Sequence, residues 1–77
     1  MSMSDTELRE KLMHEDSEFR KLAAEHQSCD HQLTELEGRH YQSEEDRLNE
    51  KKLKKMKLAL KDQMYAIMQN YRKQFES

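Results

Sequence analysis

Residues 53–67 read LKKMKLALKDQMYAI, and this stretch decides the fold. Its apolar residues recur every three or four positions, which is the spacing of one face of an α-helix. Because no proline or glycine follows until the end of the chain, we predict a helix over about residues 44–74, capped by Ser43. On the apolar face of this helix, Gln63 is an alternative to Met64, and Phe75 is a candidate for one further member of the face. The face itself comprises Leu53, Met56, Leu60, Met64, Ile67 and Tyr71.

A second heptad repeat lies upstream of this helix. Its members are spaced at 3, 4, 3, 4 and 3 residues, as in the a and d positions of a coiled coil. Asp16 is a favourable N-cap, and Gly38 is expected to end the helix as its C′ residue. The sequence therefore predicts a helix over about residues 17–37. The residues of its seam are Phe19, Leu22, His26, Cys29, Leu33 and Leu36.

The two long helices are expected to be antiparallel neighbours, because residues 38–42 form the only plausible turn between them. Their charges favour the same pairing. Residues 16–37 carry six acidic and two basic side chains, whereas residues 47–62 carry seven basic and two acidic ones. The predicted fold class is all-α, an antiparallel helical hairpin of coiled-coil type with a short N-terminal helix.

The N-terminal segment is expected to form a short helix within residues 1–15. Ser4 and Glu7 have the spacing of a capping box, and Leu8, Leu12 and Met13 give a narrow apolar face. Such a helix is too short to be stable alone. The sequence leaves open whether it docks on the hairpin of residues 16–77 or frays.

Composition narrows the class of protein further. The chain has 77 residues, which suits one domain, and it contains no proline and one glycine, which disfavours a many-stranded fold. A net charge of −2 argues against a chain that coats nucleic acid as a whole. The single cysteine suits a reducing compartment, and neither a signal peptide nor a membrane-spanning stretch is evident. We therefore expect a cytoplasmic protein without membrane contact.

Two groups of residues resemble a known family. One lies in the first long helix and comprises Phe19, Leu22, His26, Asp30, Glu37 and Gly38. The other is the run KKMKLALKDQM at residues 54–64. Together they are similar to the small bacterial proteins of the DUF465 (YdcH-like) family, over about residues 16–68. The resemblance implies a coiled-coil-like helical hairpin, with no established activity and no catalytic residues to carry over.

Catalytic and metal sites are not expected. His26 and Cys29 lie three residues apart on one helical face, but a structural zinc ion needs four ligands and His31 points elsewhere. A Cys–His catalytic pair needs a concave site that a two-helix hairpin does not offer. No phosphate-binding glycine loop or hydrolase motif is present. We predict no enzyme activity, no cofactor, no metal and no small-molecule substrate.

Leu58 and Tyr65 are the most informative apolar pair outside the seam. They lie seven residues apart, so they share a face, and relative to Leu60 that face is on the opposite side of the helix. One interpretation is two scattered exposed residues, which is common. The other is a contact surface for a second copy or another protein. A hairpin this small is marginal alone, so we expect a homo-oligomer, in the first place a dimer forming a four-helix bundle, or a protein partner.

The alternative function is association with nucleic acid through the basic run of the last helix. Lysines can track phosphates, but interleaved aromatic residues are missing, since only Tyr65 and Tyr71 lie downstream. The acidic preceding helix would also cancel part of the field. The residues of this alternative site are Lys51, Lys52, Lys54, Lys55 and Lys57.

Overall fold

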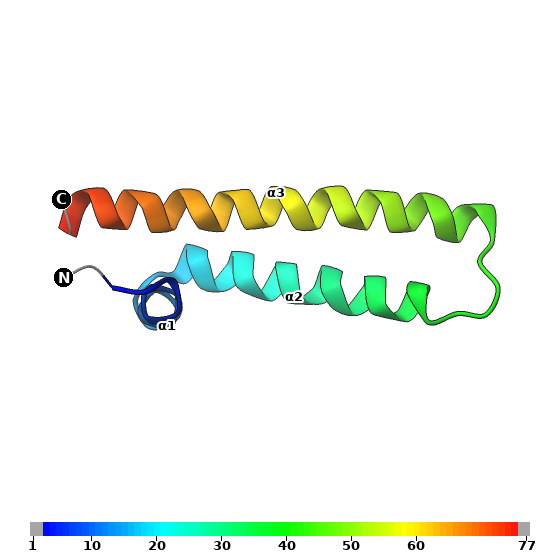
Figure 1. Ribbon diagram of the computed structural model, residues 1–77, viewed down its shortest axis with the longest axis horizontal. Helices are drawn as coiled ribbons and strands as arrows, with labels where there is room; N and C mark the ends of the chain where they lie inside the picture. The colour runs from blue at the N-terminus through cyan, green and yellow to red at the C-terminus, as the bar shows by residue number, and fades with distance from the viewer. Residues whose placement is uncertain (1–2, 76–77) are drawn as a thin grey trace.

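A computed structural model describes residues 3–75 as three helices, α1 (Asp5–Glu15), α2 (Ser17–Glu37) and α3 (Glu44–Phe75). No strand occurs among these residues, so the all-α class is confirmed. In Figure 1, α2 and α3 lie side by side with the loop at one end, and α1 runs crosswise at the other. Residues 1–2 and 76–77 of the two expected domains lie outside the described range.

The starts of the three helices follow from side-chain caps. The Ser4 hydroxyl accepts from the Glu7 N–H at 3.2 Å, and the Asp16 carboxylate accepts from the Phe19 N–H at 3.0 Å. At α3 the bonds are reciprocal. The Ser43 hydroxyl accepts from the Asp46 N–H at 3.1 Å, and the Asp46 carboxylate accepts from the Ser43 N–H at 3.2 Å. Each cap satisfies a backbone donor that the helix itself leaves unpaired.

The end of α2 differs from the expected glycine stop. Gly38 has φ −80° and ψ −6°, so it stays right-handed and the helix does not end through a left-handed residue. The last carbonyls are satisfied in other ways, because the Gln42 side chain donates to the Leu36 carbonyl at 2.7 Å and the Gly38 N–H donates to the Thr34 carbonyl at 3.0 Å. A side-chain amide from the loop therefore replaces the predicted glycine geometry.

The apolar core has two adjoining clusters along the helices. One surrounds Leu22, Cys29 and Leu60 between α2 and α3, with Leu53 at its edge. The other lies at the open end, where all three helices contribute buried side chains, namely Leu8, Leu12, Phe19 and Met68. Met64 and Ile67 pack against both clusters, which makes the core continuous.

Six of the twelve expected seam residues are buried and five are half-buried, and the remaining one, on α3, needs a correction. Met56 is 54% exposed and lies at the edge of the seam rather than in it. A strict alternation of four and three residues from Leu53 passes instead through Lys57 to Leu60. Lys57 is half-buried there. The sequence analysis therefore assigned Met56 to the seam one position too early, because the seam position itself is occupied by a lysine, Lys57.

The N-terminal helix is docked, which settles the question that the sequence left open. Leu8 is fully buried and Leu12 is 3% exposed, whereas Met13 remains 41% exposed. An ion pair of 2.8 Å between Asp5 and Arg72 joins α1 to α3. A helix of this length is stable only when it buries an apolar face, and α1 does so against the open end of α2 and α3.

Candidate functional site

Leu58 and Tyr65 are exposed on α3, at 60% and 57% respectively. The spacing from Leu60 places them on the opposite side of α3 from that residue, but the seam is wider than Leu60 alone. Leu58 directly follows Lys57 and Tyr65 directly follows Met64, so each lies about 100° round the helix from a residue at the α2 interface. The two side chains therefore flank the seam rather than lying on the far side of α3.

Beside this pair the surface is hollowed. The hollow has a volume of about 550 Å³, and it extends over parts of all three helices. Met64, which is half-buried, and Met68, which is only 3% exposed, also line it. We call this the Leu58–Tyr65 surface. Its remaining members are charged or titratable, and they are Arg9, His26, Lys57, Lys61 and Asp62.

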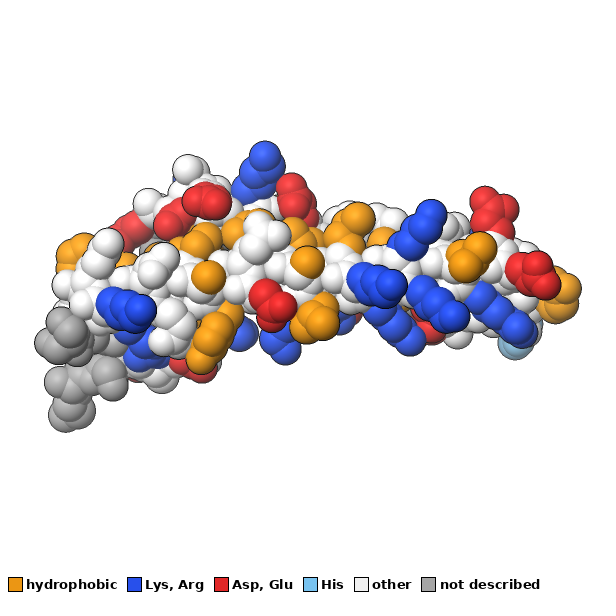
Figure 2. All heavy atoms as spheres, turned by 90° about the horizontal axis from the view of Figure 1, so that it is seen from above, with side chains coloured by type: hydrophobic (Ala, Val, Ile, Leu, Met, Phe, Trp, Pro, Cys, Tyr) orange, Lys and Arg blue, Asp and Glu red, His pale blue; other side chains and the backbone are white. Residues whose placement is uncertain are grey.

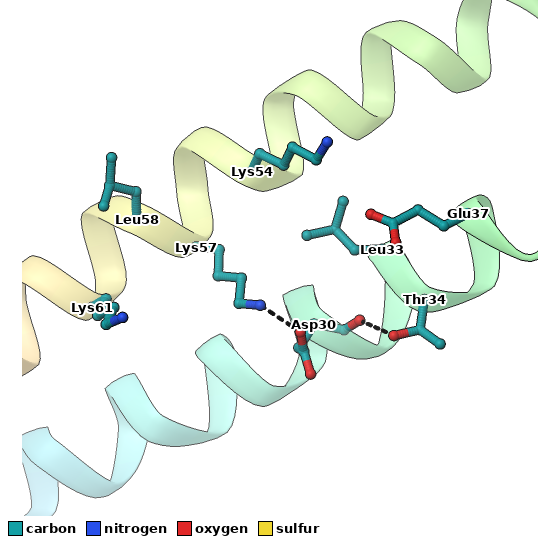
Figure 3. A pocket seen from close by; sticks show the side chains of 8 residues that line it. All are labelled: Asp30, Leu33, Thr34, Glu37, Lys54, Lys57, Leu58 and Lys61. Atoms are coloured by element: carbon teal, nitrogen blue, oxygen red, sulfur yellow. Dashed lines mark hydrogen bonds and ion pairs between the residues drawn. The ribbon is translucent and has the colours of Figure 1, made fainter.

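A second, smaller hollow adjoins this surface at Leu58 (Figure 3). It lies between α2 and α3, and opposite charges face each other across it. Lys57 of α3 forms an ion pair with Asp30 of α2. The hydrogen bond and the positive charge of Lys57 lower the pKa of the Asp30 carboxyl below its ordinary value. This pair connects the two long helices at the position where the seam has its lysine.

Lowering the pH is expected to reduce the stability of the folded state slightly, because it protonates Asp30 and so breaks its ion pair with Lys57. Because the pKa of Asp30 is lowered in the folded state, the pair contributes stability above the ordinary pKa and loses it as the pH falls through the folded value. Lys57→Met should raise the pKa of Asp30 towards its ordinary value. Titration of the Asp30 carboxyl carbon by NMR measures this shift, with the exposed Lys55→Met as the control. An unchanged Asp30 pKa in Lys57→Met would contradict the pairing.

The lysines of the basic run point to more than one side of α3. Figure 2 shows lysine and arginine side chains gathered over the half of α3 that lies towards the loop. Two of the five candidate lysines are paired, since Lys57 contacts Asp30 and Lys54 contacts Glu50 at 3.1 Å. Hydrogen bonding to Glu50 also raises the pKa of Lys54. Lys52 lies in a separate hollow with Met56, on the other flank of the seam.

Cys29 and His26 are the two residues for which the sequence raised the question of a metal site. The Cys29 thiol is part of the core and only 4% exposed. Within residues 3–75, no three His, Cys, Asp or Glu side chains are placed to hold one metal ion. In the same range, none of the helices has an apolar stretch long enough to cross a membrane.

Two members of the site escaped the sequence interpretation. Met68 follows the seam residue Ile67 directly, and a strict heptad assigns only one of them to the seam. Its burial depends on α1, which widens the apolar face of α3 at the open end. Arg9 reaches the hollow only because α1 docks crosswise. A sequence signal for Met68 existed, namely its position next to Ile67, whereas none existed for Arg9.

The fold and the surface together define a small all-α protein built on two long adjacent helices, with a shorter helix at their open end. The family model DUF465, described as a protein of unknown function, matches residues 19–68. The chain belongs to this family. The match covers most of α2 and α3 and leaves α1 outside. Comparisons with curated proteins and with solved structures give no match.

Proposed function

We propose that this protein is an antiparallel helical hairpin that acts through protein–protein contact, and that its Leu58–Tyr65 surface binds a second copy of the chain. The observation that carries this proposal is the exposure of two large apolar side chains on this surface. Leu58 and Tyr65 are more than half exposed, and they lie beside the methionines Met64 and Met68. Covering them with protein would remove apolar area from water, which favours association.

The charges of this surface are compatible with a second copy of the chain as its partner. A two-fold contact joins the same surface on both copies, so the surface has to complement itself. Lys61 and Asp62 are adjacent and of opposite charge, and both line the hollow. Across a two-fold axis, Lys61 of one copy can face Asp62 of the other. The proposal therefore commits to a dimer, in which the α3 helices of the two copies lie against each other.

The proposed setting is the cytoplasm, and the proposed role is contact rather than catalysis. The only cysteine, Cys29, is buried as a thiol, which suits a reducing compartment.

Nucleic-acid association is the alternative from a different class. It is distinguished by salt, because phosphate binding weakens steeply as salt rises, whereas an apolar contact responds little.

Two charges placed on the apolar pair are expected to dissociate the dimer. Leu58→Glu combined with Tyr65→Glu puts four carboxylates into the two-fold contact, where they are desolvated and repel one another. The mass measured by analytical ultracentrifugation should shift to that of the monomer.

A matched control uses the same substitutions outside the surface. Tyr41 and Leu48 are also exposed, at 83% and 59%, and neither lines the hollow. Tyr41→Glu combined with Leu48→Glu should therefore keep the wild-type mass. A dimer that survives Leu58→Glu with Tyr65→Glu, or a wild-type chain that is monomeric at high concentration, would contradict the proposed contact.

A further inference from the structure

The apolar repeat of α2 continues without a change of phase into α1. Counting back from Phe19, the same heptad passes through Glu15 to Leu12 and Leu8, at intervals of 4, 3 and 4 residues. Leu8 and Leu12 are the buried residues of α1. A helix that ran straight through both segments would therefore place Leu8 and Leu12 on the same stripe as the seam of α2, with Glu15 and His26 as its polar positions.

One residue interrupts this helix. Asp16 lies between α1 and α2 with φ −119° and ψ 111°, which is extended backbone. Its carboxylate accepts from the Phe19 N–H and so caps α2. The Arg20 side chain donates to the carbonyls of Met13 and His14 at 3.1 and 2.9 Å. In a continuous helix, the N–H groups four residues later would satisfy these two carbonyls instead, so both carbonyls have a donor in either conformation of the hinge.

The surface that α1 covers is apolar and lies on the other two helices. Leu8 and Leu12 pack into a cluster with Phe19 and Met68, and Ile67 and Tyr71 adjoin it. Around the cluster the contacts are polar. Asp5 pairs with Arg72, and the Lys11 ammonium lies 5.7 Å from the centre of the Tyr71 ring. These contacts of α1 with α3 do not involve the hinge at Asp16.

We propose that α1 is exchanged between two copies of this chain, so that residues 5–37 of each copy form one continuous helix whose α1 segment binds the α2–α3 groove of the other copy. The second copy is the matching partner because it offers the same Leu8 and Leu12, with Asp5 and Lys11 placed for the same contacts. A one-residue connection is a short hinge of the kind at which copies of a protein exchange elements. This inference goes beyond the Leu58–Tyr65 surface and uses a different part of the molecule.

Ser17→Pro tests the inference by locking the hinge. Ser17 is the first residue of α2, a position that suits proline, and the residue before a proline prefers the extended backbone that Asp16 already has. Inside a continuous helix the same proline is strongly destabilising, once in each copy. The association constant for the exchanged dimer should fall by at least about a hundredfold, while the helix content of the monomer stays at the wild-type level.

Asp16→Ala changes the hinge in the opposite sense. It removes the cap of α2 and places the best helix former at the connection. The association constant should rise about tenfold or more. Ser4→Ala is the matched control, because it removes the cap of α1, which the bent and the straight form share. Combined with Ser17→Pro or with Asp16→Ala, Ser4→Ala should leave the effect of either substitution on the association constant unchanged.

Two measurements decide the outcome. Ultracentrifugation gives the association constants, and filtered NOEs in a mixture of labelled and unlabelled chains show whether Leu12 contacts Met68 of the same chain or of another. Contacts between chains in wild type or Asp16→Ala, lost in Ser17→Pro, support the exchange. An Asp16→Ala chain that stays monomeric at millimolar concentration overturns it. So does a dimer that survives Ser17→Pro and disappears in Leu58→Glu with Tyr65→Glu, which would belong to the other surface.

Discussion

Phe19→Ala should lower the free energy of unfolding by about 3–5 kcal/mol. Phe19 is 1% exposed and lies in the cluster where all three helices meet, so the cavity left by its ring can close only if α1 moves. Domains of this size have only a few kcal/mol of stability in total. The expected result is therefore a chain that is largely unfolded at ambient temperature, as measured by circular dichroism and urea titration.

Phe75→Ala is the matched control for this change. Phe75 is 69% exposed, and its ring contacts Tyr71 with a centroid distance of 4.7 Å. Losing that contact should cost less than about 1 kcal/mol. Equal losses of stability in Phe19→Ala and Phe75→Ala would show that the three-helix cluster is not the centre of the fold.

Met68→Ala should lower the free energy of unfolding by about 2–5 kcal/mol. Met68 is 3% exposed and packs in the cluster that joins α3 to α1, so its removal leaves a cavity between the helices. Met56→Ala makes the same change at a site that is 54% exposed, and it should cost about 0.5 kcal/mol or less. Thermal melts of the two variants compare them directly.

This pair of methionines also tests the position of the seam on α3. If Met56 belonged to the seam, as the apolar pattern suggested, Met56→Ala would be about as damaging as Met68→Ala. The structure instead places Lys57 at that level of the seam, paired with Asp30. It buries Met68 at the open end, in the cluster to which α1 contributes Leu8 and Leu12. Similar losses of stability in the two variants would contradict this placement.

The sequence predicted the helices closely because the signals for them are local. Heptad spacing, the caps Asp16 and Ser43 and the lack of proline are properties of neighbouring residues, and they predicted both bounds of α2 and the start of α3. The backbone conformation of Gly38 was predicted wrongly, although α2 ends at the expected residue. The reason is that the Gln42 side chain satisfies a carbonyl of α2 from across the loop.

The candidate surface was only partly predictable. The exposure of Leu58 and Tyr65 follows from their spacing, and the structure shows both side chains exposed. Their hollow, however, needs Arg9 of α1 and His26 of α2 beside α3. No periodicity within α3 contains that information, since it depends on how three helices pack.

The sequence by itself determined the all-α class, the family and the places where helices begin, because these depend on residue type and on spacing along one chain. Only the tertiary structure decided that α1 docks, that Lys57 rather than Met56 faces α2, and that Met68 is buried. The physical reason is the same in each case. Burial and ion pairing are set by the side chains that another helix brings within contact, and the linear pattern of one helix does not record them.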